Sequence, residues 1–173
     1  MHFEERHFQR SRSIRLPEFD NRCGSRPLAE GKREMQKQKY CVYNQTRESF
    51  LSLGVAAADT TLARLKGLIG KLHLELDEGL WIIPSQGIHT VGVLFPIDLV
   101  YLDESYRVLH VIESFPTFRI SPWITQAASV LELPTHTVYS SQTQPGDQLV
   151  ICVAEEMEQR LQVNNSNLTR QAT

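Results

Sequence analysis

The sequence predicts a mainly β fold: a compact antiparallel β-sandwich or barrel-like domain with one amphipathic α-helix packed on it. Short apolar runs separated by turn residues recur between positions 39 and 154. Only one segment repeats its apolar residues at helical spacing. A single helix leaves nothing to supply the crossovers that parallel strands need, so we expect no βαβ arrangement.

Seven segments have the length and composition of strands, bounded by Gly, Pro, Asn or Asp. The turn Asp103-Glu104-Ser105 joins two of them and predicts a hairpin. Pro145-Gly146-Asp147 predicts another turn before the last strand. The expected strands are 39–43, 50–57, 79–84, 97–102, 106–112, 128–133 and 148–154.

The helix is expected over 61–69. Asp59 and Thr60 are good N-cap residues, and Gly70 is a typical stop signal. We expect its apolar face to pack on the sheet. That face would consist of Leu62, Leu65, Leu68 and Ile69.

Composition divides the chain into a disordered basic N-terminal extension (1–38), one β-rich domain (39–154) and a polar C-terminal tail (155–173). In the tail we expect a frayed helical turn over 155–161 and disorder over 164–173. Residues 40–154 hold six Lys/Arg and eleven Asp/Glu, a net charge of −5, whereas residues 1–39 have a net charge of +4. The extensions lack apolar periodicity, which is typical of disorder. Met35 offers an alternative start just before the domain.

Several classes of function have no support. The overall charge of −2 gives no reason to expect a nucleic-acid partner. Three cysteines without a CxxC pair, and no HxxxH or HxH motif, predict neither a metal nor a cofactor. The sequence contains no apolar run near the ~20 residues that a membrane helix needs and no secretory signal. We therefore expect a cytoplasmic protein with a small-molecule or protein partner.

Five short motifs occur in a recognisable order: Arg64 with Gly67-Leu68, Gly79 to Pro84, Pro96-Ile97-Asp98, Glu132-Leu133-Pro134, and Gly146-Asp147. In this order, over about 50–154, they resemble the bacterial and archaeal family known as domain of unknown function 192, or uncharacterised protein family 0127. The resemblance implies a compact β-sandwich-like fold and no settled activity. Many relatives carry export signals or lipid anchors, and this chain shows neither.

Two stretches depart from the family pattern. Residues 88–95 stand where the family usually has an aromatic-Met-Lys-Asn-Thr stretch. After the Glu-Leu-Pro motif the family tends to place a small residue and Gly, where this chain has Thr135-His136. We expect the other motif residues to have structural roles. Arg64 is expected to point inward and to hold a carboxylate, with Asp98 as its leading partner. The residues with expected structural roles are Arg64, Gly67, Gly79, Pro96, Pro134, Gly146 and Asp147.

Five polar residues are candidates for ligand binding: His89, Thr90, Asp98, Glu132 and His136. A carboxylate at Asp98, in an otherwise apolar strand, must be paired or hydrogen-bonded. It is either a ligand anchor or a structural acceptor for the 87–94 loop or Arg64, and we favour the structural role. Glu132 alternates with two leucines, so it lies either at a solvated edge or on the rim of a pocket.

These observations favour a non-enzymatic ligand-binding or accessory domain. The alternative is a small hydrolase-like enzyme that uses Asp98 with His89 or His136, which requires those side chains to lie within hydrogen-bonding reach around a cavity. The aromatic and basic loop 115–123 either covers one end of the barrel or stacks on a ligand; we favour the first.

Overall fold

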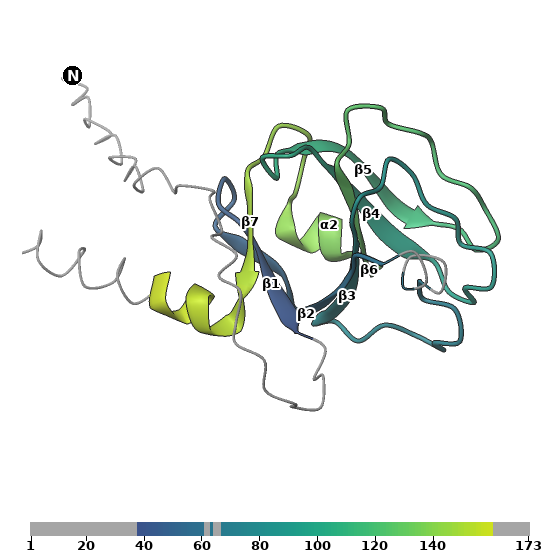
Figure 1. Cartoon of the computed structure of the whole chain (residues 1–173), viewed down its shortest axis with the longest axis horizontal. Helices are drawn as coiled ribbons and strands as arrows, with labels where there is room; N and C mark the ends of the chain where they lie inside the picture. The colour runs from purple at the N-terminus through teal and green to yellow at the C-terminus, as the bar shows by residue number, and fades with distance from the viewer. Residues whose placement is uncertain (1–37, 61–62, 64–66, 161–173) are drawn as a thin grey trace, which may run out of the picture.

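The computed structural model describes residues 38–60, 63 and 67–160 (Figure 1). These residues form one seven-stranded sheet in the order β5-β4-β6-β3-β2-β1-β7. The elements are β1 (Lys39–Asn44), β2 (Ser49–Ala58), β3 (Glu78–Ile82), β4 (Ile97–Leu102), β5 (Val108–Phe115), β6 (Ser129–Pro134), α2 (Thr137–Ser141) and β7 (Leu149–Val153).

The predicted mainly β fold is confirmed, and each expected strand appears within a few residues of its expected bounds. One expectation is wrong: β2 and β3 are parallel, in a register that runs from Gly54 opposite Glu78 to Ala58 opposite Ile82. The connection 59–77 is longer than the dozen or so residues that a parallel crossover needs. One crossover, through the segment that carries the predicted helix, is therefore enough to make the sheet mixed.

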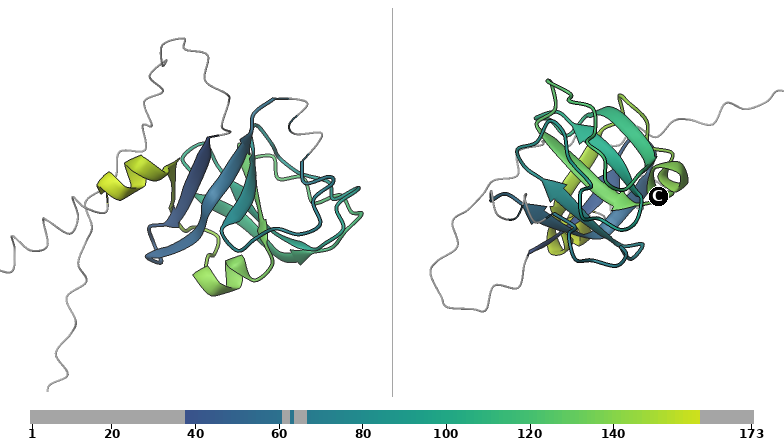
Figure 2. Two further views of the ribbon diagram at one scale, coloured as in Figure 1. Left: turned by 90° about the horizontal axis from the view of Figure 1, so that it is seen from below. Right: turned by 90° about the vertical axis from the view of Figure 1, so that its right-hand side faces the viewer.

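The sheet curls until its first and last strands meet at one point (Figure 2). The Val108 N–H at the start of β5 donates to the Asp147 carbonyl at 2.9 Å, and the Leu149 N–H at the start of β7 donates to the Tyr106 carbonyl at 3.0 Å. These bonds occupy backbone groups that an open sheet would leave unpaired at both edges. Within residues 67–160 these edge contacts form one isolated bridge and not a strand ladder, so the fold is a half-barrel made from one sheet.

Each face of the central strands packs against its own hydrophobic cluster. One cluster joins alternate residues of β4 and β6, among them Val100 and Leu131, to Val138 of α2. The other joins Leu99 and Val130 to residues of the loops that follow β3 and β5. Strands β4 and β6 are buried along their whole length, because side chains on both faces are covered.

Two helical segments complete the described part of the chain. Helix α2 was not predicted; it lies at one end of the curl, in contact with β2, β4 and β5 (Figure 2). Residues 154–160 are also helical, and Met157 is buried against Cys41 and Cys152. None of the helices in the described residues has the length and apolar character required to span a membrane.

The predicted helix over 61–69 falls largely outside the described residues, and so do Arg64 and Leu65. At Ala63 the backbone is helical, and its carbonyl accepts the Gly67 N–H at 2.9 Å. Leu68 is buried as expected, whereas Ile69 is exposed. Of the extensions expected to be disordered, residues 1–37 and 161–173 also lie outside the described residues, whereas Met157 at the start of the C-terminal tail is buried in a helical segment.

The central strand β6 yields a test of the core. Leu131 is fully buried and Leu76 is 84% exposed, so the same truncation should destabilise the protein strongly at Leu131 and hardly at all at Leu76. Leu131→Ala should lower the free energy of unfolding by about 2–5 kcal/mol, whereas Leu76→Ala should change it by less than ~0.5 kcal/mol. Urea unfolding followed by tryptophan fluorescence measures both. Equal effects would contradict the assignment of β6 to the centre of the sheet.

Candidate functional site

The Asp98 carboxylate is fully buried and accepts two backbone hydrogen bonds. Its Oδ1 accepts the Ser114 N–H at 2.8 Å, and its Oδ2 accepts the Val138 N–H at 2.9 Å. The β4–β5 register shifts at this point, because Ile97 pairs with Phe115 and Leu99 pairs with Ile112. Such a bulge leaves an N–H without a partner in the ladder, and Asp98 binds the one at Ser114.

The second bond of Asp98 satisfies the first turn of α2. His136 is the N-cap residue of this helix, and its side chain makes no capping hydrogen bond. The first N–H groups of a helix have no partner within it, so the carboxylate takes over the missing cap at Val138. The expected acceptor role of Asp98 is therefore seen, but its donors are Ser114 and Val138 rather than the 87–94 loop.

Asp98 and His89 do not share a site. Across the β4–β6 ladder Asp98 pairs with Leu133, and Leu99 pairs with Glu132. Residues opposite each other project to the same face, and neighbours along a strand project to opposite faces. Asp98 thus faces α2, while Glu132 faces the side on which His89 lies. His136 is exposed at the start of α2, so the structure does not assemble the expected trio of Asp98, His89 and His136.

Glu132 is the unusual group on the other face. The residue is only 3% exposed, and its Oε2 has no hydrogen-bond partner among the described residues. Burial raises the pKa of its carboxyl group to about 8. Trp81 Nε1 and Ser129 Oγ are also buried without a described partner, but neither borders this cavity. The solvated-edge interpretation of Glu132 is wrong, because β6 is an interior strand.

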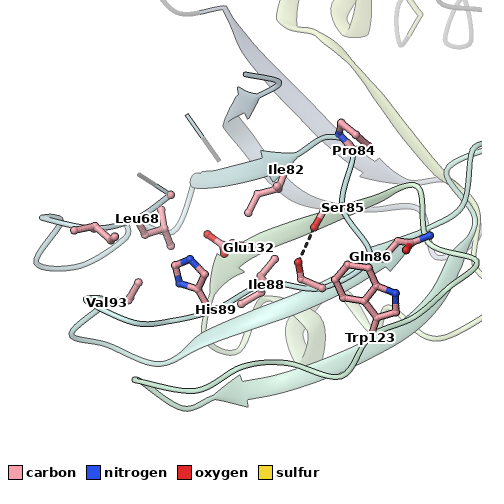
Figure 3. Close-up of a pocket in the computed structure, with 13 residues that line it drawn as sticks. Leu68, Ile82, Pro84, Ser85, Gln86, Ile88, His89, Val93, Trp123 and Glu132 are labelled. Carbon is pink, nitrogen blue, oxygen red and sulfur yellow. Dashed lines mark hydrogen bonds between the residues drawn. The ribbon is translucent and has the colours of Figure 1, made fainter. Parts of the chain in front are cut away.

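Glu132 lies at the floor of a cavity of about 300 Å³. Figure 3 shows its carboxyl group among the side chains of Leu68, Ile82 and His89. Further apolar wall comes from Ile88 and Val93. A mostly apolar hollow with a few polar groups is the usual form of a small-molecule site.

Two loops form the outer wall of this cavity, and backbone hydrogen bonds hold them together. The Thr90 N–H donates to the Arg119 carbonyl at 2.8 Å, and the Ser121 N–H donates to the Ile88 carbonyl at 3.0 Å. The buried Thr90 hydroxyl donates to the Pro116 carbonyl at 2.8 Å and accepts the Arg119 N–H at 2.9 Å. Thr90 is therefore engaged in the wall, and the loop 115–123 covers a sheet face while keeping Trp123 exposed.

Several of the described residues with expected structural roles occupy tight positions or turns. A Cβ on Gly79 would meet Leu133 Cδ2 at 2.9 Å and the Glu132 carbonyl oxygen at 3.1 Å, so β3 and β6 approach each other closely there and a larger residue would require its neighbours to move. Gly146 has a φ of 95°, which suits the turn before β7. Pro134 ends β6 opposite Ile97. Gly67, with a φ of 47°, follows the helical residue Ala63, and Pro96 immediately precedes β4.

Asp147 joins the turn before β7 to the end of β1. It accepts hydrogen bonds from Asn44 Nδ2 and Arg47 Nε, both at 3.0 Å, and from the Gln144 N–H at 2.9 Å. Burial by itself raises the pKa of Asp147, but the hydrogen bonds from Arg47, Asn44 and the Gln144 amide together lower it below its usual value. This arrangement serves the fold rather than a ligand.

Sequence reasoning missed several residues of the cavity. Ser85 and Gln86 line it, and so does Trp123, which belongs to the aromatic loop for which ligand stacking was the less favoured role. Their spacing in the sequence carries no signal, because they meet only when the loops fold over the sheet. A second hollow of about 510 Å³ lies over β2 and β3, but Glu78 there is already paired with Lys71 at 2.8 Å. No group of three or more His, Cys, Asp or Glu within the described ranges could hold a metal.

A curled β-sheet with a small cavity on one face defines a β-rich domain that is distinct from the common sandwich of two sheets. A family model described as an uncharacterized ACR, domain of unknown function 192, matches residues 42–151. The chain belongs to this family, which confirms the resemblance found in the five motifs. No curated protein matches the chain.

Two solved structures share the fold. A protein of unknown function from Novosphingobium aromaticivorans aligns with a TM-score of 0.56 and 18% identity, over 64% of this chain and 82% of that one. A candidate transcription regulator from Sinorhizobium meliloti aligns with a TM-score of 0.55 and 19% identity, over 65% of this chain and 91% of that one. At such identities the likeness concerns the fold alone.

The two hydrogen bonds that Asp98 accepts predict the effect of replacing it by asparagine. Asp98→Asn replaces one acceptor oxygen by an NH₂ group, so one of the two backbone N–H groups would face a donor. The free energy of unfolding should fall by about 1–3 kcal/mol. In the matched control Asp103→Asn the loss should be below ~0.5 kcal/mol, because Oδ1 of Asp103 alone accepts both of its backbone bonds. Urea unfolding measures both variants, and an unchanged Asp98→Asn protein would refute the anchoring role.

The raised pKa of Glu132 predicts a dependence of stability on pH. Between pH 4.5 and about 8 the folded state holds a proton that the unfolded state has lost, so stability should fall as pH rises through this window. Glu132→Gln removes this contribution. The variant should gain stability relative to wild type by about 1 kcal/mol per pH unit from pH 5 to 8.

Urea unfolding at several pH values measures that difference. His89, the other titratable side chain lining the cavity, is present in both proteins, so the difference isolates Glu132. Parallel stability curves for the two proteins would show that the Glu132 carboxyl group is ionised and paired in the folded state.

Proposed function

We propose that this chain is a non-enzymatic small-molecule-binding domain, and that its site is the cavity over β6. The observation that carries the proposal is Glu132, whose Oε2 is buried without a partner in the described part of the chain. Leaving such a group unsatisfied costs about 1–3 kcal/mol or more. A protein retains that cost most readily where a ligand supplies the missing partner.

The cavity is also built to keep its shape. Its floor belongs to β3 and β6, which pair through Leu80–Glu132 and Ile82–Val130. Its outer wall is held by the bonds between the loops, and the Ile88 N–H adds one to the Ser121 hydroxyl at 2.8 Å. A wall fixed in this way reduces the ordering that a ligand must impose, which favours binding.

Geometry gives little support to the hydrolase alternative. Both oxygens of Asp98 accept backbone N–H groups, and the sheet separates this carboxylate from His89. A general base must lie within hydrogen-bonding reach of its partner around a cavity. In our proposal His89 contributes to ligand contact at the cavity, and His136 has no part in it.

An accessory or protein-interaction role is the second candidate. The loops beside the cavity expose large apolar side chains, and an antiparallel bridge between His89 and Ile120 brings these loops together. Exposed apolar groups that gather on one surface often mark binding sites. The exposed side chains are Val91, Leu94, Phe118, Ile120 and Trp123.

Occluding the cavity tests the proposal. His89→Trp places a bulky ring at a side chain that lines the cavity but is itself exposed, so the fold should tolerate it. Compounds found by ligand-observed NMR in a metabolite library should bind this variant at least ~10-fold more weakly than wild type. The control His73→Trp changes an exposed histidine outside the cavity and should leave affinity unchanged. Equal weakening by both variants, or a library without any ligand, would refute the proposal.

A further inference from the structure

The charges around the cavity are one-sided. Glu132 is the only acid that lines it in the described ranges, and neither Lys nor Arg occurs among its described lining residues. The domain 40–154 carries a net charge of −5, which raises the local concentration of cations. The site therefore offers one carboxyl group, which becomes negative when it is ionised, and no Lys or Arg among its described lining residues.

The apolar part of the cavity wall determines the chemical character of the rest of the ligand. Leu68, Ile82, Ile88 and Val93 present hydrocarbon to a volume of about 300 Å³, at the lower end of the ~300–1,000 Å³ typical of ligand sites. A compact aliphatic body fills such a space without burying further polar groups.

We propose that the ligand class of this cavity is a small aliphatic amine, bound as an ammonium ion whose N–H groups donate to Glu132 while its hydrocarbon lies against the apolar wall. This inference rests on the proposed function, because it names the ligand class of the same site. In this inference Glu132 is the charge partner of the ammonium group. The apolar side chains of Leu68, Ile88 and Val93 select the hydrocarbon part of the ligand.

Chemistry favours the ammonium ion over its neutral and anionic analogues. A buried carboxylate is costly unless it is both paired and hydrogen-bonded, and an ammonium group supplies the opposite charge and several donors at once. A hydroxyl group supplies one donor and no charge. An anionic head would place a second negative group beside Glu132, with no described cation in the lining to offset it.

The protonation of free Glu132 gives this binding a distinct dependence on pH. Burial holds its pKa at about 8, and an ammonium ion binds the ionised form, so binding below that pH releases one proton. The affinity for an amine should rise about tenfold per unit between pH 6 and 7, and level off above pH 8. The affinity for a neutral alcohol should not rise with pH.

Other titratable groups face the same side of the sheet. His89 lies on the loop that covers the cavity, and Glu78 lies two residues from Leu80, the β3 partner of Glu132. Glu78 is engaged with Lys71 at 2.8 Å. Protonation of His89 would also oppose a cation, so the slope with pH is measured in His89→Gln as well, where it should persist.

Three probes with the same branched carbon skeleton separate the possibilities: isoamylamine, isoamyl alcohol and isovalerate. Each is titrated at millimolar concentration into the full chain, and affinity is read from ¹H–¹⁵N chemical shifts of residues 85–93. We expect isoamylamine to bind at least ~10-fold more tightly than isoamyl alcohol at pH 8, and isovalerate not to bind.

Matched variants locate the interaction. Glu132→Gln keeps the shape of the side chain and removes its charge, so amine affinity should fall at least ~10-fold while alcohol affinity changes less than ~3-fold. Glu78→Gln makes the same substitution outside this cavity and should bind the amine as wild type does. Equal loss in both variants would overturn the assignment of the ammonium ion to Glu132.

Two further results overturn the ammonium inference and leave the cavity as a binding site. In one, the alcohol or isovalerate binds as tightly as the amine. In the other, a ¹³C NMR titration places the pKa of Glu132 near the 4.5 of an ordinary Glu, which would show that the chain itself already pairs this carboxylate. If none of the three probes shifts the residues of the cavity, the ammonium inference fails, and the metabolite library then decides separately whether the cavity binds any small molecule.

Discussion

Strands β4 and β6 lie side by side and are buried on both faces, so a polar side chain in them is costly unless it is hydrogen-bonded. Each strand carries one carboxylate. Because Asp98 and Glu132 stand one register position apart, alternation sends them to opposite faces of the sheet. The two acids thereby acquire different roles: Asp98 is saturated by backbone donors, whereas Glu132 is left with an oxygen that has no partner among the described residues.

Asp98 shows how one buried acid can hold distant parts of a small fold together. Its two oxygens satisfy the bulge in β5 and the first turn of α2, so one side chain joins three elements. Helix α2 has only five residues, too few to be stable alone. Its place at the end of the curl depends on Val138, which packs into the core and donates to Asp98.

The opposite face is closed by irregular backbone. Residues 85–95 and 115–124 contain no regular element apart from the end of β5, yet their backbone groups bond to one another and the Thr90 and Ser121 hydroxyls accept further N–H groups. Irregular structure can cover a sheet only when its polar groups are satisfied in this way. The stretch 88–95 contributes Ile88, His89 and Val93 to the cavity.

The sequence by itself determined the strands, the hairpin of β4 and β5, the family and the structural importance of Asp98, because period-two alternation and turn residues are local signals. It also placed Glu132 and His89 among five candidates. The tertiary structure decided which of them meet. The parallel pairing of β2 and β3, the short helix α2 and the contact between the two loops all depend on residues far apart in the chain, for which no local pattern exists. The sequence showed that Glu132 alternates with two leucines, but only the strand order shows that β6 is an interior strand. Because loops cover the face of the sheet on which Glu132 lies, this side chain is buried at the floor of a cavity and not exposed to solvent.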